Sequence, residues 1–138
     1  MEKVLGIAVK GIVACNGKIL IVQRCPGEKY NPLAWEFPGG KIEFGEKLEE
    51  ALHREIREEV SLAVTVDGLL YASMFFPKPT RQVVILTYAC TAEPGQVVLS
   101  DEHVDFKWAT RAEAEALLEG NILDDIARHD VFAKLKID

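Results

Sequence analysis

The sequence predicts an α+β fold, an α/β/α sandwich in which helices flank a central mixed β-sheet. Three observations support this prediction. Runs at residues 4–15 and 18–24 are dense enough in Val and Ile to be strands that are covered on both faces. A charged segment with helical periodicity follows them at residues 46–62. Further strand-like runs and a second helical region complete the order expected of a layered fold.

Length and composition indicate a single domain over residues 1–138, with 49% apolar and 28% charged residues. The net charge of −6 argues against a broad basic face for duplex nucleic acid, and the composition is not that of a membrane-spanning protein. Three cysteines without a CxxC pair indicate neither a zinc site nor a disulfide framework. We therefore expect a cytoplasmic protein, either monomer or homodimer, with no membrane or duplex partner.

The N-terminal elements are expected to form a hairpin. Asn16-Gly17 joins its two strands, because this pair readily adopts the positive φ angles of a two-residue type I′ turn. Residues 25–32 contain Pro, Gly and Asn and indicate a loop. A short extended stretch then ends at Pro38, and Gly39-Gly40 follows, where the backbone can approach a ligand closely.

The second half is expected to contribute strands at residues 68–76, 82–91 and 104–109. Residues 77–81 between the first two form a loop predicted to be too long for a tight turn and to lie over a binding cleft. Thr110 and Glu113 form a capping box for a helix at 111–119, which Gly120 ends. Asn121 is expected to cap a last helix whose apolar residues reach Leu135.

The central helix is expected to start near Gly45 or Glu46 and to carry an acidic cluster. Glu55, Glu58 and Glu59 fall within roughly a 100° arc of one face at about 100° per residue. Like charges at this spacing repel one another, so their convergence suggests a cation such as Mg²⁺, which prefers oxygen ligands. Earlier on the same side, the helix is apolar and is expected to face inward, through Leu48, Ala51 and Leu52. The alternative is a solvated face with ion pairs between neighbouring turns, such as Arg54–Glu58.

The stretch from Gly39 to Leu62 resembles the Nudix box, GX5EX7REUXEEXGU, in which U is a bulky apolar residue. Gly40, Glu46, the run 54–60 and Leu62 all agree with the pattern. Only Ser61 departs, where the pattern has Gly, and Gly adopts the left-handed geometry of a helix exit more cheaply than Ser. The resemblance covers nearly the whole chain and implies the Nudix fold.

The resemblance also implies a divalent-cation site, for Mg²⁺ with Mn²⁺ as a substitute. Its implied ligands are the Gly40 carbonyl, Glu55, Glu58 and Glu59, with Glu55 also a candidate general base. Arg54 would orient Glu55 rather than touch the substrate.

Two further carboxylates are weighed for this site. Glu102, next to Asp101, is the favoured distal carboxylate, as an added ligand or base, and the alternative is a solvated loop residue. Glu46 either stabilises the helix dipole or supports the metal site.

Within the family, the segment from Glu36 to Glu43, followed by Gly45-Glu46, has the form used by MutT-type nucleoside triphosphate pyrophosphohydrolases. That likeness implies substrate contacts from Arg24, Arg81 and Asn121, and Lys41 is a candidate to offset phosphate charge. Arg24 and Arg81 are otherwise surface charges, and for Asn121 the cap is the favoured interpretation. Candidates to stack on a base, or else to belong to the core, are Trp35, Phe75 and Phe76. None of the three histidines is given a catalytic role.

The resemblance thus implies hydrolysis of a nucleoside diphosphate linked to another group. The expected substrate is a nucleoside triphosphate, with an oxidised purine included, cleaved to monophosphate and pyrophosphate. The alternative within the family is ADP-ribose or a nucleotide sugar. Since that subgroup often has an extra N-terminal strand region and this chain starts directly with a sheet strand, we expect it less. The alternative from another class is a nucleotide sensor that does not cleave its ligand.

Overall fold

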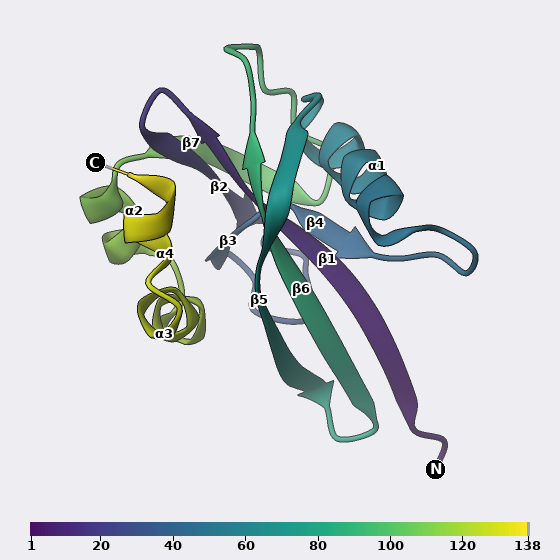
Figure 1. Ribbon diagram of the computed structural model, residues 1–138. Coiled ribbons are helices and arrows are strands. Elements are labelled where there is room, and N and C mark those ends of the chain that lie inside the picture. The colour runs from purple at the N-terminus through teal and green to yellow at the C-terminus, as the bar shows by residue number, and fades with distance from the viewer. Residues whose placement is uncertain (138) are drawn as a thin grey trace.

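A mixed seven-stranded sheet forms the centre of the computed structural model, which describes residues 1–137 (Figure 1). The main path of the sheet has the order β3-β2-β1-β6-β5, with β4 paired to β1 and β7 to β2. The β1–β6 pair is parallel, and the other pairs are antiparallel. The strands are β1 (Val4–Cys15), β2 (Lys18–Arg24), β3 (Trp35–Glu36), β4 (Gly39–Lys41), β5 (Thr65–Lys78), β6 (Arg81–Thr91) and β7 (His103–Ala109).

Helices cover both faces of this sheet, as predicted. In Figure 1, α1 (Leu48–Val60) lies on one side, and α2 (Arg111–Leu117), α3 (Gly120–Arg128) and α4 (Val131–Leu135) lie on the other. Each layer has its own apolar core, one built against α1 and one against α2 to α4. No helix within residues 1–137 is long and apolar enough to cross a membrane.

The burial of both faces of the central strands explains why most of their residues are apolar. In β1, Val9 and Val13 pack on the α1 side, whereas Ile12 packs on the opposite side. Successive side chains of a strand point to opposite faces, so a strand between two helical layers needs apolar residues at every position. The N-terminal hairpin also forms as predicted, with φ values of 53° at Asn16 and 77° at Gly17.

The central helix starts later than the sequence indicated. It begins at Leu48, because Gly45 has a φ of 91° that no right-handed helix accepts. Glu46 therefore precedes the helix, and Leu48, expected to face inward, is 37% exposed. At the other end Ser61 adopts the left-handed conformation with a φ of 63°, and its Oγ donates to the Val98 carbonyl at 3.1 Å. The helix exit thus keeps the geometry that Gly would give.

The predicted loop over residues 77–81 is wrong. Strand β5 runs to Lys78 and β6 starts at Arg81, and these two residues are paired across the strands. Only Pro79 and Thr80 remain for the turn, which is tight. The register shifts between Phe75 and Lys78, an irregularity that lets the strand accommodate Pro77 without a ladder donor.

The C-terminal region contains three helices where two were expected. The Thr110 capping box forms, since Glu113 N–H donates to the Thr110 Oγ1 at 3.2 Å, but α2 ends at Leu117. Gly120 begins α3 instead of ending α2, so Asn121 lies in its first turn and the cap position belongs to Glu119. The cap interpretation of Asn121 is therefore wrong. The last predicted helix is divided because Asp130 is left-handed, with a φ of 52°.

Candidate active site

One cavity of about 960 Å³ opens along the sheet and gathers most of the predicted site residues. Its volume lies in the range of small-molecule binding sites. Metal-site candidates on β4, on α1 and just before β7 line it. Substrate candidates on β2, β4, β6 and α3 line it as well. The predicted residues in its lining are Arg24, Gly40, Lys41, Glu55, Glu59, Arg81, Glu102 and Asn121.

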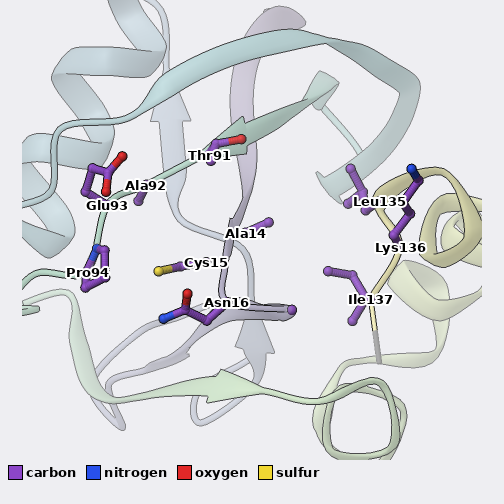
Figure 2. A pocket seen from close by; sticks show the side chains of 11 residues that line it. Ala14, Cys15, Asn16, Thr91, Ala92, Glu93, Pro94, Leu135, Lys136 and Ile137 are labelled. Atoms are coloured by element: carbon purple, nitrogen blue, oxygen red, sulfur yellow. The ribbon is translucent and has the colours of Figure 1, made fainter.

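A second cavity of about 290 Å³ lies between the β1–β2 turn, the end of β6 and the C-terminal residues (Figure 2). Within residues 1–137, none of the predicted site residues lines it. Glu93 and Lys136 are its charged residues, and Cys15 contributes a thiol. Of the residues that the structure describes, only these two charged ones line the smaller cavity, whereas many charged residues line the larger one.

The acidic end of α1 is held against β4. A Cβ placed on Gly40 would lie 2.5 Å from the Glu55 Oε2 atom, so the carboxylate reaches this position because residue 40 has no side chain. The Gly39 N–H donates to the Glu59 Oε1 at 2.9 Å. Strand β4, which the sequence did not predict, pairs with β1 and sets the position of both glycines. The backbone of Gly39 and Gly40 therefore lies directly against the carboxylates of Glu59 and Glu55.

Arg54 joins the carboxylates around it. Its Nε donates to Glu46 at 2.7 Å, and its Nη1 donates to Glu55 at 2.9 Å and to Glu58 at 3.3 Å. Hydrogen bonding from Arg54 lowers the pKa of Glu46 to about 2, so Glu46 is a fixed anion that anchors the guanidinium. Glu46 lies before the helix and contacts Arg54, and this contact agrees with a supporting role. Glu58 has a 59% exposed side chain and does not line the main cavity.

Burial shifts the pKa of the two inner carboxylates, Glu55 and Glu59. It raises the pKa of Glu55, an effect that the hydrogen bond from Arg54 opposes and the charges of Glu58 and Glu102 reinforce. It also raises the pKa of Glu59 to about 9, against the opposing charge of Lys10. Without further positive charge, Glu59 therefore holds a proton at neutral pH. Buried carboxylates that crowd one another in this way fit a divalent cation.

Glu102 supplies a carboxylate from the opposite side of the cluster. One ligand atom each from Glu59, Glu102 and His103 lie within 4.8 Å of one another. Asp101 and Glu102 are both exposed, but only Glu102 lines the main cavity. Of Asp101 and Glu102, the structure therefore places Glu102 next to the proposed metal ligand Glu59.

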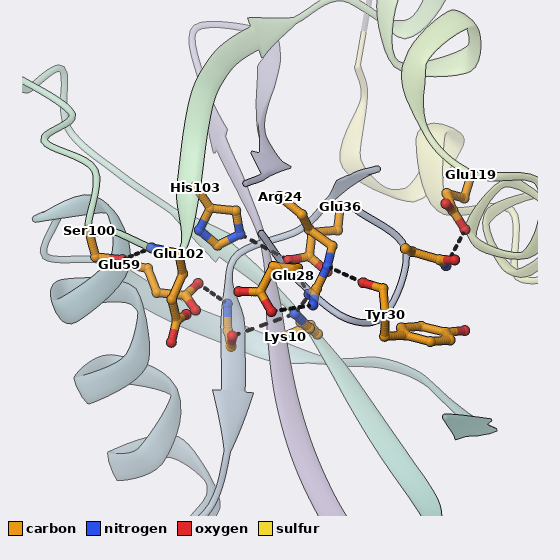
Figure 3. Close-up of polar contacts among 12 residues, drawn as sticks. Lys10, Arg24, Glu28, Tyr30, Glu36, Glu59, Ser100, Glu102, His103 and Glu119 are labelled. Atoms are coloured by element: carbon orange, nitrogen blue, oxygen red, sulfur yellow. Dashed lines mark hydrogen bonds and ion pairs between the residues drawn. The ribbon is translucent and has the colours of Figure 1, made fainter. Parts of the chain in front are cut away.

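A partly buried ionic cluster that the sequence did not indicate lies beside this site (Figure 3). Glu36 lies 2.9 Å from the His103 Nε2, 3.3 Å from Arg24 and 3.6 Å from the Lys10 Nζ. Burial alone would raise the pKa of Glu36, but the charges of Lys10 and Arg24 and the hydrogen bond from His103 lower it to about 2. No local pattern marks this cluster, because Glu36 and His103 are 67 residues apart in the chain.

The far part of the cavity carries aromatic and polar groups. The rings of Tyr30 and Phe75 lie 5.4 Å apart, and both residues line the cavity with Trp35. Phe76, by contrast, is 56% exposed and does not line the cavity. Arg24 lines the cavity but is engaged by Glu28, Glu36 and the Tyr30 carbonyl, and thus is not a free surface charge. Burial and the neighbouring Arg81 lower the pKa of Lys41.

Comparison with known proteins identifies this arrangement. The NUDIX domain matches residues 5–129, which is most of the chain. The chain belongs to the Nudix family. It is a Nudix hydrolase of the MutT type. Nudix hydrolases generally use a divalent metal, and the group of Glu59, Glu102 and His103 is a candidate place for one.

The names of the relatives within the Nudix family refer to different substrates. CTP pyrophosphohydrolase of Escherichia coli (strain K12) is 45% identical over 106 residues, covering 77% of this chain and 76% of that protein. ADP-ribose pyrophosphatase of Methanocaldococcus jannaschii is 44% identical over 100 residues, covering 70% of this chain and 56% of its own length. 8-oxo-dGTP diphosphatase of Haemophilus influenzae is 34% identical over 87 residues, covering 63% of this chain and 62% of its own length. The chain thus spans less than two thirds of two of these relatives.

The crystal structure of a MutT protein from Methanosarcina mazei Go1 shares the fold, with a TM-score of 0.85 and 24% identity over 97% of this chain and 99% of that one. The α+β fold with a central mixed sheet is therefore confirmed.

Proposed function

We propose that this Nudix hydrolase is a Mg²⁺-dependent enzyme that cleaves a nucleoside triphosphate to the monophosphate and pyrophosphate. The observation that carries the proposal is the convergence of Glu55, Glu59 and Glu102 at one end of a nucleotide-sized cavity with aromatic and polar groups at the other. This arrangement matches the two parts of a nucleotide, the polyphosphate and the base. A nucleotide is accordingly the proposed small-molecule partner.

Each residue of the acidic end has a proposed role. Glu58, Glu59, Glu102 and the Gly40 carbonyl would hold the cation together with Glu55. When bound, the cation supplies positive charge to the phosphate oxygens and lowers the pKa of water. Glu55 would accept the proton of the attacking water, a role that suits a carboxylate whose pKa burial has raised. Arg54 would hold Glu55 in place through its 2.9 Å hydrogen bond.

The remaining candidates would bind the rest of the substrate. Lys41 and Arg81 line the cavity near each other and would offset the charge of the triphosphate. Phe75 and Tyr30 offer aromatic faces to a base. Asn121, in the first turn of α3, would donate and accept hydrogen bonds at the edge of the base. Arg24 would act indirectly, by holding Glu36 and the Tyr30 carbonyl.

The names of the relatives support a nucleoside triphosphate as the first candidate substrate and ADP-ribose as the alternative. CTP pyrophosphohydrolase and 8-oxo-dGTP diphosphatase both act on triphosphates by name, so pyrimidine and oxidised purine nucleotides are the first candidates. The ADP-ribose pyrophosphatase, at 44% identity, supports the alternative substrate class. A nucleotide sensor is disfavoured because binding alone does not need the full set of Arg54, Glu55, Glu58 and Glu59.

The test is release of pyrophosphate or phosphate with and without Mg²⁺. The panel contains the eight common nucleoside and deoxynucleoside triphosphates, 8-oxo-dGTP, ADP-ribose, nucleotide sugars and diadenosine polyphosphates. We expect Mg²⁺-dependent release of pyrophosphate from one triphosphate above the others. Activity confined to ADP-ribose or sugars would refute the substrate class and keep the chemistry. Tight nucleotide binding without any turnover would refute catalysis.

A further inference from the structure

A buried imidazole lies directly beside the proposed metal ligands. His103 is the first residue of β7, and only 2% of its side chain is exposed. Its Nε2 lies 2.9 Å from the Glu36 Oε2, whereas its Nδ1 is buried and has no hydrogen-bond partner among residues 1–137. Buried side-chain polar atoms nearly always have a partner, so this nitrogen requires an explanation.

The unpartnered nitrogen faces the carboxylates. In Figure 3 the ring nitrogen that is not joined to Glu36 lies on the side of Glu59 and Glu102. One ligand atom from each of these three residues lie within 4.8 Å of one another. Two ligands at about 2.1 Å from a common cation are at most about 4.2 Å apart, so small side-chain rotations bring all three onto one ion.

Glu36 prepares His103 for this role. Arg24 at 3.3 Å and Lys10 at 3.6 Å hold the Glu36 carboxylate next to the ring. An ionised carboxylate only accepts hydrogen bonds, so the Nε2 of His103 is the nitrogen that donates to Glu36, and Nδ1 is the ring nitrogen left for another partner. A carboxylate behind an imidazole is the usual support of a metal-bound histidine, because it fixes the tautomer and the orientation of the ring.

We infer that the Nδ1 of His103 and the carboxylates of Glu59 and Glu102 form a mixed nitrogen and oxygen site for a first-row transition cation such as Mn²⁺ or Co²⁺. Mg²⁺ is served by oxygen ligands, whereas imidazole suits transition metals. The inference rests on the proposed metal-dependent function and extends it, by adding His103 as a ligand and by assigning the class of cation that this position prefers.

Mn²⁺ binding without substrate tests the inference. Pulsed electron paramagnetic resonance of the Mn²⁺-loaded wild-type protein should show the coupling of a directly bound imidazole ¹⁴N. The coupling should disappear in His103→Gln and persist in His53→Gln, a matched control for a histidine on α1 outside the cavity lining. In titrations, His103→Gln should weaken Mn²⁺ binding by at least about tenfold and Mg²⁺ binding by much less. Glu36→Gln should weaken Mn²⁺ binding by about tenfold, through loss of the support behind the ring.

The outcomes separate this inference from the proposed function. Bound Mn²⁺ without nitrogen coupling in the wild-type protein would overturn the inference and leave metal-dependent hydrolysis intact. Equal losses of Mn²⁺ and Mg²⁺ affinity in His103→Gln would also overturn it. No cation binding at all would overturn both. The wild-type spectrum decides the matter even if a His103 variant fails to fold, and circular dichroism identifies that case.

Discussion

Replacing Gly40 with Ala tests whether the position of the Glu55 carboxylate controls catalysis. The added Cβ would lie 2.5 Å from the Glu55 Oε2 and 2.7 Å from its Cδ, well inside ordinary van der Waals contact. The carboxylate must therefore move by about 1 Å, and a displacement of that size at a catalytic group costs about 100-fold in rate. This loss corresponds to about 2.7 kcal/mol in the activation free energy. Arg54 holds the carboxylate at 2.9 Å, so the side chain does not swing aside freely.

The assay is kcat/KM for the best substrate of the panel, together with the melting temperature. Gly40 is not among the residues with positive φ, so Ala fits the backbone and the free energy of unfolding should change by less than about 1 kcal/mol. Gly27→Ala is the matched control, because a Cβ there meets no atom within 4 Å and activity should not change. A Gly40→Ala enzyme that melts normally and keeps kcat/KM within about threefold of wild type would refute the positional argument.

Three further predictions address a ligand, a base contact and a stabilising ion pair. Glu58→Gln should lower Mg²⁺-dependent turnover by at least about 100-fold at an unchanged melting temperature, and wild-type turnover would exclude Glu58 as a ligand. Asn121→Ala should change the ratio of kcat/KM between nucleobases by about tenfold, whereas an equal loss on every base would contradict a base contact. Glu113→Gln should lower the melting temperature at pH 7. The hydrogen bond from Lys107 lowers the pKa of Glu113 from 4.5 to about 2, so the stabilisation is complete above pH 4.5 and is lost as the pH falls toward 2. A difference in melting temperature that is constant over this range would refute the assignment.

Most elements of the fold were predictable because their signals are local. The Asn16-Gly17 turn, the periodicity of α1 and the Thr110 capping box depend on residues within one or two turns of one another. The errors arose where tertiary context overrode a local signal. Pro77 lies in an irregular strand rather than a loop, and the first turn of α3 takes in the Asn121 that was predicted to cap it.

The spacing of the Nudix box alone determined that Glu55, Glu58 and Glu59 share one helix face, since 3.6 residues per turn is a property of the backbone. Pairing between distant strands decided the rest. The register of β7 on β2 sets His103 opposite Arg24, and the register of β3 on β2 sets Glu36 opposite Val22. A partly buried ionic cluster therefore forms behind the carboxylates. Strand registers depend on contacts between segments far apart in the chain, and no spacing within one segment encodes them.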